Sequence, residues 1–282
     1  MRTEKPYQER LSVERRRLRV GPVATEILIT GEGPPLFFLH PELGRRDGSE
    51  FIEQLSARFK VYAPSLPGYD GTPVPSDFDS IEDLAYFGLD VLAALDLTGI
   101  VVIGVSLGAW IAAAMAIKEI SRINRLALVA PVGVKFGARD KREIADLFSV
   151  TPEEFDALAY GDPVAAAARY AALDNDQMNR FAGNYEATAR YAWLPYMYDP
   201  KLLSRLYRIR RPTLCVWGTK DRVVSEDYVR NFAEALPDGT FVLLPGTGHF
   251  PHIEDPAGLT ERILSFAASD RGPNHVAACR SR

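Results

Sequence analysis

The chain of 282 residues has little of what several specialised protein classes depend on. It contains only four histidines and two cysteines, Cys215 and Cys279, and neither cysteine belongs to a C-x-x-C pair or a zinc-ligand spacing. We therefore expect no metal site and no disulfide framework, which fits a reducing, cytoplasmic location. The sequence also lacks a G-K-[ST] phosphate loop and a dinucleotide fingerprint, so we expect no cofactor.

Charge of one sign is not in excess either. Lys and Arg together number 33 against 37 Asp and Glu, which gives a formal net charge of −4. Without a basic excess, nucleic acid is not an expected partner. A small charged cluster, Glu14 to Arg17, is interpreted as a solvated stretch that leads into the first strand.

Long hydrophobic runs are also missing, with one exception. No charged residue occurs between Asp96 and Lys118, and this stretch is long enough for a membrane helix. Its two halves differ, because Ile100 to Val105 is largely β-branched whereas Ala109 to Ile117 is rich in alanine. That change favours a buried strand, a sharp turn and a buried helix, so we expect no membrane association.

Strands alternate with helices along most of the chain. This alternation predicts the α/β class, with a mostly parallel central sheet covered by helices on both faces. Apolar strands are expected at Leu18–Val20, Thr25–Thr30, Leu36–Leu39, Val61–Ala63, Ile100–Val105, Arg125–Val132, Thr213–Trp217 and Phe241–Leu244. A helix is expected over Gly48–Phe59, and another begins after Ser80, whose hydroxyl and Asp83 form a weak capping box.

The alternation stops between Lys135 and Arg208, where only helical patterns occur. Five helices are expected there, at Asp140–Phe148, Thr151–Tyr160, Val164–Leu173, Asn175–Thr188 and Pro200–Ile209. We interpret residues 135–208 as an inserted all-helical cap. Residues 1–134 and 209–270 would then form the core, and the polar residues 271–282 a disordered tail.

The sequence Gly104-Val105-Ser106-Leu107-Gly108 has the form G-x-S-x-G. It follows a β-branched strand and opens an alanine-rich helix, which is the context of a nucleophile elbow. Small residues are needed where such a strand and helix approach each other. We therefore predict that Ser106 is a nucleophile, with the helix N-terminus beside it available to stabilise an oxyanion.

A serine hydroxyl needs a base, and His249 is the predicted one. It lies in a glycine-rich loop, Gly246 to Phe250, directly after a predicted strand. The rival is His252, three residues later, which leads into an acidic stretch that ends at Pro256. The flanking glycines let the loop of His249 reach the site, which favours His249.

The third member of a triad must orient the imidazole, and Asp221 is the predicted acid. It follows the strand Thr213–Trp217, at the strand's carboxyl end. Glu226 and Asp227 are rivals, but they fall in the first turn of the next predicted helix. The strand before the cap ends Ala130–Gly133 without a carboxylate, which further favours Asp221.

With these residues in place, the chain resembles the α/β-hydrolase fold serine hydrolases, in particular bacterial carboxylesterases with a helical cap. The resemblance covers roughly Leu18 to Ser269, and the order Ser106, Asp221, His249 matches the family order. It implies a mostly parallel central sheet flanked by helices, with the cap inserted.

The resemblance also implies an oxyanion hole formed by the backbone N–H groups of Leu107 and Glu42. Many relatives have His-Gly in this loop, whereas this chain has His40-Pro41-Glu42. A Glu42 side chain turned inward would repel the oxyanion. We expect it to turn outward, as a surface charge.

A serine at the elbow, rather than the aspartate of epoxide hydrolases and haloalkane dehalogenases, favours acyl transfer to water. The predicted function is hydrolysis of a carboxylic ester of a small, apolar or aromatic substrate, with His40, Trp193 and Tyr196 lining the pocket. A C–C bond hydrolase or a cofactor-free perhydrolase could use the same triad, and a slow-turnover ligand receptor is the non-enzyme alternative. The expected partner is the small ester-like substrate, and a homodimer is left open.

Overall fold

A computed structural model describes residues 13–45, 49–138 and 140–269. Its centre is an eight-stranded sheet with the order β1-β2-β4-β3-β5-β6-β7-β8. The strands are β1 Glu14–Val20, β2 Val23–Thr30, β3 Pro35–Leu39, β4 Lys60–Pro64, β5 Ile100–Val105, β6 Ile123–Val129, β7 Thr213–Gly218 and β8 Gly239–Leu244. The predicted disordered tail, Gly48 and Cys279 lie outside the described residues.

All strand pairs from β4 through β3 to β8 are parallel, whereas β1–β2 and β2–β4 are antiparallel. The central strands β5 and β7 are buried at every position. Both read as continuous apolar runs because helices cover both faces of the sheet. The mostly parallel sheet flanked by helices confirms the predicted fold class.

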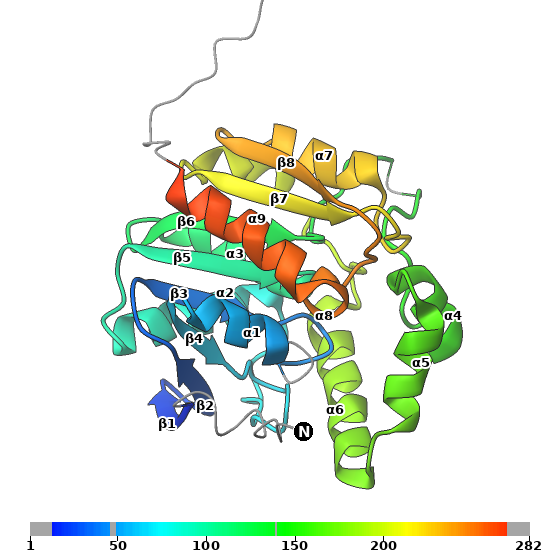
Figure 1. The fold of residues 1–282 in the computed structure, drawn as a ribbon, viewed down its shortest axis with the longest axis horizontal. Helices are drawn as coiled ribbons and strands as arrows, with labels where there is room; N and C mark the ends of the chain where they lie inside the picture. Colours follow the sequence, from blue (N-terminus) through cyan, green and yellow to red (C-terminus); the bar gives the residue numbers. More distant parts are fainter. Residues whose placement is uncertain (1–12, 46–48, 139, 270–282) are drawn as a thin grey trace, which may run out of the picture.

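Helices cover the two faces of the sheet in separate groups. On the front face in Figure 1, α1 (Ser49–Ser56) packs against α9 (Pro256–Ala268). On the opposite face, α2 (Ile81–Ala94) packs against α3 (Leu107–Lys118), and α7 (Glu226–Glu234) packs on β7 and β8. At the start of α2, Ser80 and Asp83 form a full capping box, as the sequence predicts.

The uncharged stretch between Asp96 and Lys118 divides as its two halves predict. Its β-branched part is β5, its alanine-rich part is α3, and Ser106 separates them. Among the helices of the described residues, none is both long and apolar enough to cross a membrane. The apolar character of this stretch is therefore explained by burial in the core.

The charged cluster Glu14 to Arg17 is part of the first strand, so the prediction of a stretch that merely leads into it is wrong. These residues pair with β2 along an antiparallel edge ribbon, and their side chains are exposed. Arg15 forms an ion pair with Glu26 of β2 at 2.9 Å. A charged edge strand of this kind discourages pairing with a second sheet.

The described part of residues 135–208, the predicted cap, contains three α-helices, α4 (Pro152–Ala159), α5 (Pro163–Ala171) and α6 (Asn175–Ala192). Figure 1 shows them gathered at one end of the sheet, away from the helices that cover its faces. The helix expected at Pro200–Ile209 is a shorter 3₁₀ helix, η3 (Leu203–Arg208). That residues 135–208 form a separate domain stays a prediction.

The helix expected at Asp140–Phe148 is absent, and the prediction is wrong. This segment is irregular, and part of its backbone bonds to a distant loop. Ile144 forms an isolated bridge with Val224, and the Ala145 N–H donates to the carbonyl of Val223. The segment is therefore held against the loop that follows β7 as well as by contacts of its own, such as the Arg142–Asp146 ion pair.

Candidate active site

Ser106 lies at the sharp turn between β5 and α3. Its φ of 50° and ψ of −114° are a strained conformation for a residue with a side chain. A Cβ atom added at Gly104 would lie 2.2 Å from the carbonyl oxygen of Gly108, and one at Gly108 would lie 2.2 Å from that of Leu39. Both positions therefore require glycine, which explains the G-x-S-x-G spacing.

Three side chains form one hydrogen-bonded line at this turn. The His249 Nε2 atom lies 2.8 Å from Ser106 Oγ, and its Nδ1 lies 2.8 Å from Asp221 Oδ2. The other Asp221 oxygen accepts hydrogen bonds from the N–H groups of Val223 and Val224. All three side chains are buried, so the structure brings together the three residues that the sequence singles out.

The electrostatic surroundings of His249 favour its charged form. Complete burial lowers the pKa of the imidazole, but the Asp221 carboxylate and its hydrogen bond outweigh that effect. The negative charge of Glu42 acts in the same direction as Asp221. The net result is a His249 pKa above the ordinary value, which makes the ring a better proton acceptor.

The rival histidine, His252, lies in the short helix α8 (Pro251–Glu254) and is buried. Its ring packs beside the rings of Phe38 and Phe51. The Ser106 hydroxyl is instead hydrogen-bonded to His249 Nε2. His252 is therefore placed among the apolar side chains under α1 and α9.

The rival acids also lie apart from the imidazole. Glu226 and Asp227 occupy the first turn of α7, where negative charge complements the helix dipole, and Glu226 pairs with Arg230. Within the described ranges, no group of three or more His, Cys, Asp or Glu side chains is arranged to hold a metal ion. The chemistry available at this site is that of Ser106, His249 and Asp221.

His40 supports the loop that follows β3. Its buried ring accepts a 3.2 Å hydrogen bond at Nε2 from the Leu66 N–H, so its Nδ1 carries the proton and donates to the Pro41 carbonyl at 2.7 Å. Burial lowers the pKa of this histidine. Both ring nitrogens are thus occupied by backbone groups, one in the loop after β3 and one in the loop after β4. The sequence predicts His40 as a pocket residue, and that role stays a prediction.

The two backbone N–H groups predicted for the oxyanion hole are those of Leu107 and Glu42, and neither is used in a helix or strand. Leu107 is the first residue of α3, so its N–H has no partner within the helix. In the described chain, the Glu42 N–H makes no hydrogen bond to another backbone group. The oxyanion hole itself stays a prediction.

The expectation that the Glu42 side chain turns outward is wrong. Glu42 is only 3% exposed, and its Oε2 atom is buried without a hydrogen-bond partner in the described residues. Asn184 of α6 is bonded to the same loop, because its side chain donates a 2.8 Å hydrogen bond to the carbonyl of Leu43. Glu42 is thus buried in a loop that α6 contacts.

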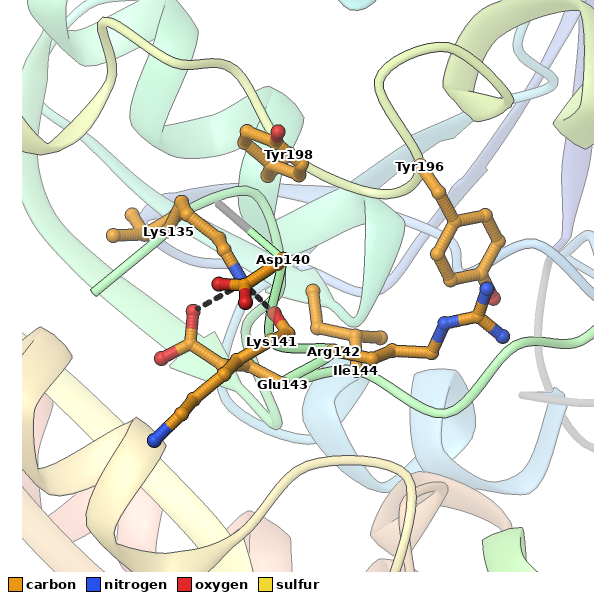
Figure 2. Close-up of a pocket in the computed structure, with 9 residues that line it drawn as sticks. Lys135, Asp140, Lys141, Arg142, Glu143, Ile144, Tyr196 and Tyr198 are labelled. Carbon is orange, nitrogen blue, oxygen red and sulfur yellow. Dashed lines mark hydrogen bonds and ion pairs between the residues drawn. The ribbon is translucent and has the colours of Figure 1, made fainter. Parts of the chain in front are cut away.

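Tyr196 is held by its hydroxyl group in the irregular part of the cap. The hydroxyl donates to the Ala145 carbonyl and accepts from the Leu147 N–H, both at 2.8 Å. Figure 2 shows its ring beside Arg142, at a cavity of about 210 Å³ lined by residues of the 134–144 segment. None of the three hydrogen-bonded residues at the elbow lines that cavity.

Trp193 ends α6 and is 52% exposed. Its ring lies edge-on to that of Phe148, with 5.1 Å between the ring centroids. Leu194, the next residue, is also exposed. The roles of Trp193 and Tyr196 in a substrate pocket stay predictions.

Sequence patterns missed one residue that supports the site, Glu254 at the end of α8. Its Oε2 accepts a 2.6 Å hydrogen bond from the Gly248 N–H, and its Oε1 accepts a 2.7 Å hydrogen bond from the Gly161 N–H. One carboxylate therefore joins the loop of His249 to the segment between α4 and α5. No local signal marks it, because a glutamate before Asp-Pro is ordinary at the start of a helix.

Known proteins are similar to this chain in sequence. Residues 33–262 match the model of the alpha/beta hydrolase family. The chain is 25% identical over 256 residues to a pimeloyl-[acyl-carrier protein] methyl ester esterase of Vibrio vulnificus, across 84% of this chain and 95% of that protein. It is 24% identical over 286 residues to a 2-hydroxy-6-oxo-6-(2'-aminophenyl)hexa-2,4-dienoic acid hydrolase of Metapseudomonas resinovorans, across 94% of this chain and 92% of that protein.

A similar fold occurs among solved structures. A membrane phospholipase A superposes with a TM-score of 0.75 at 21% identity, over 90% of this chain and 86% of that one. This likeness concerns the fold alone. The family match extends from the turn before β3 to α9 and includes the elbow and the loops of Asp221 and His249. The chain belongs to the alpha/beta hydrolase family.

Proposed function

We propose that this protein is a serine hydrolase that cleaves the carboxylic ester of a small, apolar or aromatic substrate through an acyl-enzyme. The observation that carries the proposal is the hydrogen-bonded line from Ser106 through His249 to Asp221, with 2.8 Å at each step. The strained φ of Ser106 adds support, because such strain concentrates at functional sites. The esterase of Vibrio vulnificus supports an ester as the bond that is cleaved.

The first half of the reaction uses this hydrogen-bonded line. Ser106 Oγ attacks the ester carbonyl carbon while its proton passes to His249 Nε2. Asp221 stabilises the imidazolium that forms and holds the ring in the required tautomer. The tetrahedral intermediate then expels the alcohol, which takes the proton from His249 and leaves the acyl group on Ser106.

The negative charge of the intermediate needs hydrogen-bond donors. The N–H groups of Leu107 and Glu42 are the proposed donors, and the N-terminal end of α3 adds a favourable dipole. In the second half of the reaction, His249 takes a proton from water as the water attacks the acyl carbonyl. Collapse of that intermediate releases the carboxylic acid and returns the proton to Ser106.

Cleavage of a C–C bond is the second candidate, and one observation favours it. The relative from Metapseudomonas resinovorans is a dienoic acid hydrolase, and it matches 94% of this chain. Such a substrate would need the same nucleophile and oxyanion donors but a carbon leaving group. The two reactions therefore differ in what the pocket binds rather than in the triad.

A substrate panel on the purified chain separates the candidates. The panel contains a short 4-nitrophenyl ester, a lactone and a 2-hydroxy-6-oxo-dienoic acid, each measured as kcat/KM. The proposal expects the ester to be the best substrate, with hydrolysis abolished in Ser106→Ala. Preference for the dienoic acid would favour the C–C hydrolase, and no turnover of any compound would favour the ligand receptor.

A further inference from the structure

The Glu42 carboxylate is an unusual feature of the loop beside the elbow. It is buried, its Oε2 has no hydrogen-bond partner, and none of the ion pairs found in the described residues includes it. An ionised carboxylate removed from water is unfavourable unless a counter-charge or hydrogen-bond donors compensate it. Among the described residues, no counter-charge pairs with Glu42 and no donor reaches its Oε2, so this oxygen is available to a group carried by a ligand.

Glu42 lies between the elbow and the cap. On the core side, Gly108 of the elbow lies against the carbonyl groups of Leu39 and His40, which begin the same loop. On the cap side, Asn184 of α6 is bonded to the next residue, Leu43. The loop of Glu42 therefore lies between the elbow and α6, and the Glu42 side chain is buried there.

The negative charge of Glu42 affects the pKa values of side chains in α6 and at the elbow. Burial raises the pKa of the Tyr185 hydroxyl in the cap, and the negative charge of Glu42 raises it further. The same charge acts on His249 in the core, together with Asp221. The negative charge of Glu42 thus raises the pKa of both a side chain of α6 and the proposed base.

A negative charge here conflicts with ester hydrolysis of a neutral substrate. The oxyanion that forms on the substrate would lie near the Glu42 backbone and be repelled by the Glu42 carboxylate. A positive charge on the substrate removes this conflict, because it pairs with the carboxylate before the oxyanion forms. An ammonium group is also attracted by aromatic rings. Burial raises the pKa of the Tyr69 and Tyr185 hydroxyl groups, and the negative charge of Glu42 raises both pKa values further.

We propose that Glu42 is a specificity-determining residue that binds a protonated amine carried by the substrate near the scissile ester. This inference rests on the proposed serine-hydrolase function and refines its substrate to an apolar or aromatic ester that also carries one protonated amine. Glu42 then acts in two ways: it attracts a substrate with an ammonium group, and it disfavours an isosteric neutral substrate.

The test uses matched esters that differ only in a nitrogen. On the alcohol side, 2-(dimethylamino)ethyl butanoate is compared with 3-methylbutyl butanoate. On the acyl side, ethyl 4-(dimethylamino)butanoate is compared with ethyl 5-methylhexanoate. The kcat/KM of each ester is measured in a pH-stat at pH 7.5, where the amines are protonated, for the wild type, Glu42→Gln and Glu186→Gln.

We expect the wild type to prefer the amine in one of the two pairs by about 30-fold or more, the scale of a buried charge pair. Glu42→Gln should reverse this preference, because the amine loses its partner and the neutral ester loses a repulsive charge. Glu186→Gln changes an exposed carboxylate of α6 and should retain the wild-type preference. Equal changes for both members of each pair in Glu42→Gln would overturn the proposal, because Glu42 would then act through His249 or the loop.

Binding gives a readout that does not require turnover. In Ser106→Ala, calorimetry should give a Kd for the preferred amine ester about 30-fold or more below that of its neutral isostere. Adding Glu42→Gln to Ser106→Ala should remove this difference, and an unchanged difference would overturn the proposal. Preferential binding without hydrolysis in the wild type would contradict the proposed function while supporting the role of Glu42. Hydrolysis of both esters without preference would support the proposed function and contradict the role of Glu42.

Discussion

The backbone N–H of His249 donates a 2.6 Å hydrogen bond to the carbonyl oxygen of Ala159, the last residue of α4. The loop of the proposed base is thus bonded directly to the first helix of the cap. Close backbone packing reinforces this contact, since a Cβ atom at Gly248 would lie 2.2 Å from the same carbonyl oxygen. A change in the position of α4 is therefore expected to change the position of the imidazole.

Glu254 is predicted to be a positioning residue for His249, because it bonds the N–H groups of both Gly248 and Gly161. In Glu254→Gln, one oxygen is replaced by an NH₂ group that must face an N–H donor. We expect kcat on a short aryl ester to fall about 3- to 10-fold, since Glu254 is only partly buried and solvent weakens its hydrogen bonds.

The matched control for Glu254 is Glu234→Gln, which makes the same change at an exposed position of α7. It should retain wild-type kcat. If Glu254 had a purely structural role, Glu254→Gln would lower the melting temperature and leave the kcat of the folded fraction unchanged. That result would contradict the positioning role.

The pH dependence of kcat/KM should follow the titration of His249. The base must be neutral to accept the Ser106 proton, so activity rises as the pH rises through its pKa. Because Asp221 outweighs the effect of burial and raises that pKa, the midpoint should lie above about 6.5. In Asp221→Asn the midpoint should fall, together with kcat.

Rates from about pH 5 to 9 on an ester without ionisable groups test this prediction. His252→Asn should keep the wild-type midpoint, because His252 lies among aromatic side chains away from Ser106. A flat profile would argue against a histidine base. A midpoint that moves in His252→Asn would mean that the wrong histidine has been assigned.

The hydrogen-bonded residues could be found from the sequence because each has a local signal. Ser106 lies between two glycines that the close approach of β5 and α3 requires, and Asp221 and His249 follow strands whose carboxyl ends meet at one edge of the sheet. Because the strands are parallel and the loops that follow them are short, these side chains are expected to lie close together.

The features that the sequence did not reveal depend on contacts distant in the chain. Residues 140–148 have a helical pattern, but Ile144 pairs with Val224, 80 residues away, and that contact outweighs local propensity. Glu42 is enclosed because α6 covers its loop through Asn184. Glu254 gains its role from two glycines in different parts of the fold.

The two cap aromatics are predicted to act differently when replaced. Trp193 has an exposed ring that contacts Phe148, so Trp193→Ala should change the preferred acyl length or ring size by roughly 10- to 100-fold in relative kcat/KM. Tyr196 holds the backbone of Ala145 and Leu147, so Tyr196→Phe should chiefly lower the melting temperature. A series of acyl esters and a thermal melt of each variant measure both effects. Uniform loss on every ester in Trp193→Ala, with a lowered melting temperature, would show that Trp193 only holds the cap together.

The central claim is that Ser106 becomes covalently acylated, and it can be measured directly. A fluorophosphonate probe is added to the wild type, to Ser106→Ala and to the control Ser204→Ala, and each protein is then digested for mass spectrometry. The control alters an exposed serine of η3. We expect one probe adduct on the Ser106 peptide of the wild type and of Ser204→Ala, and none in Ser106→Ala. The kcat of Ser106→Ala should fall by on the order of 10⁶. An adduct on another residue, or a Ser106→Ala variant that keeps a substantial fraction of wild-type activity, would contradict it.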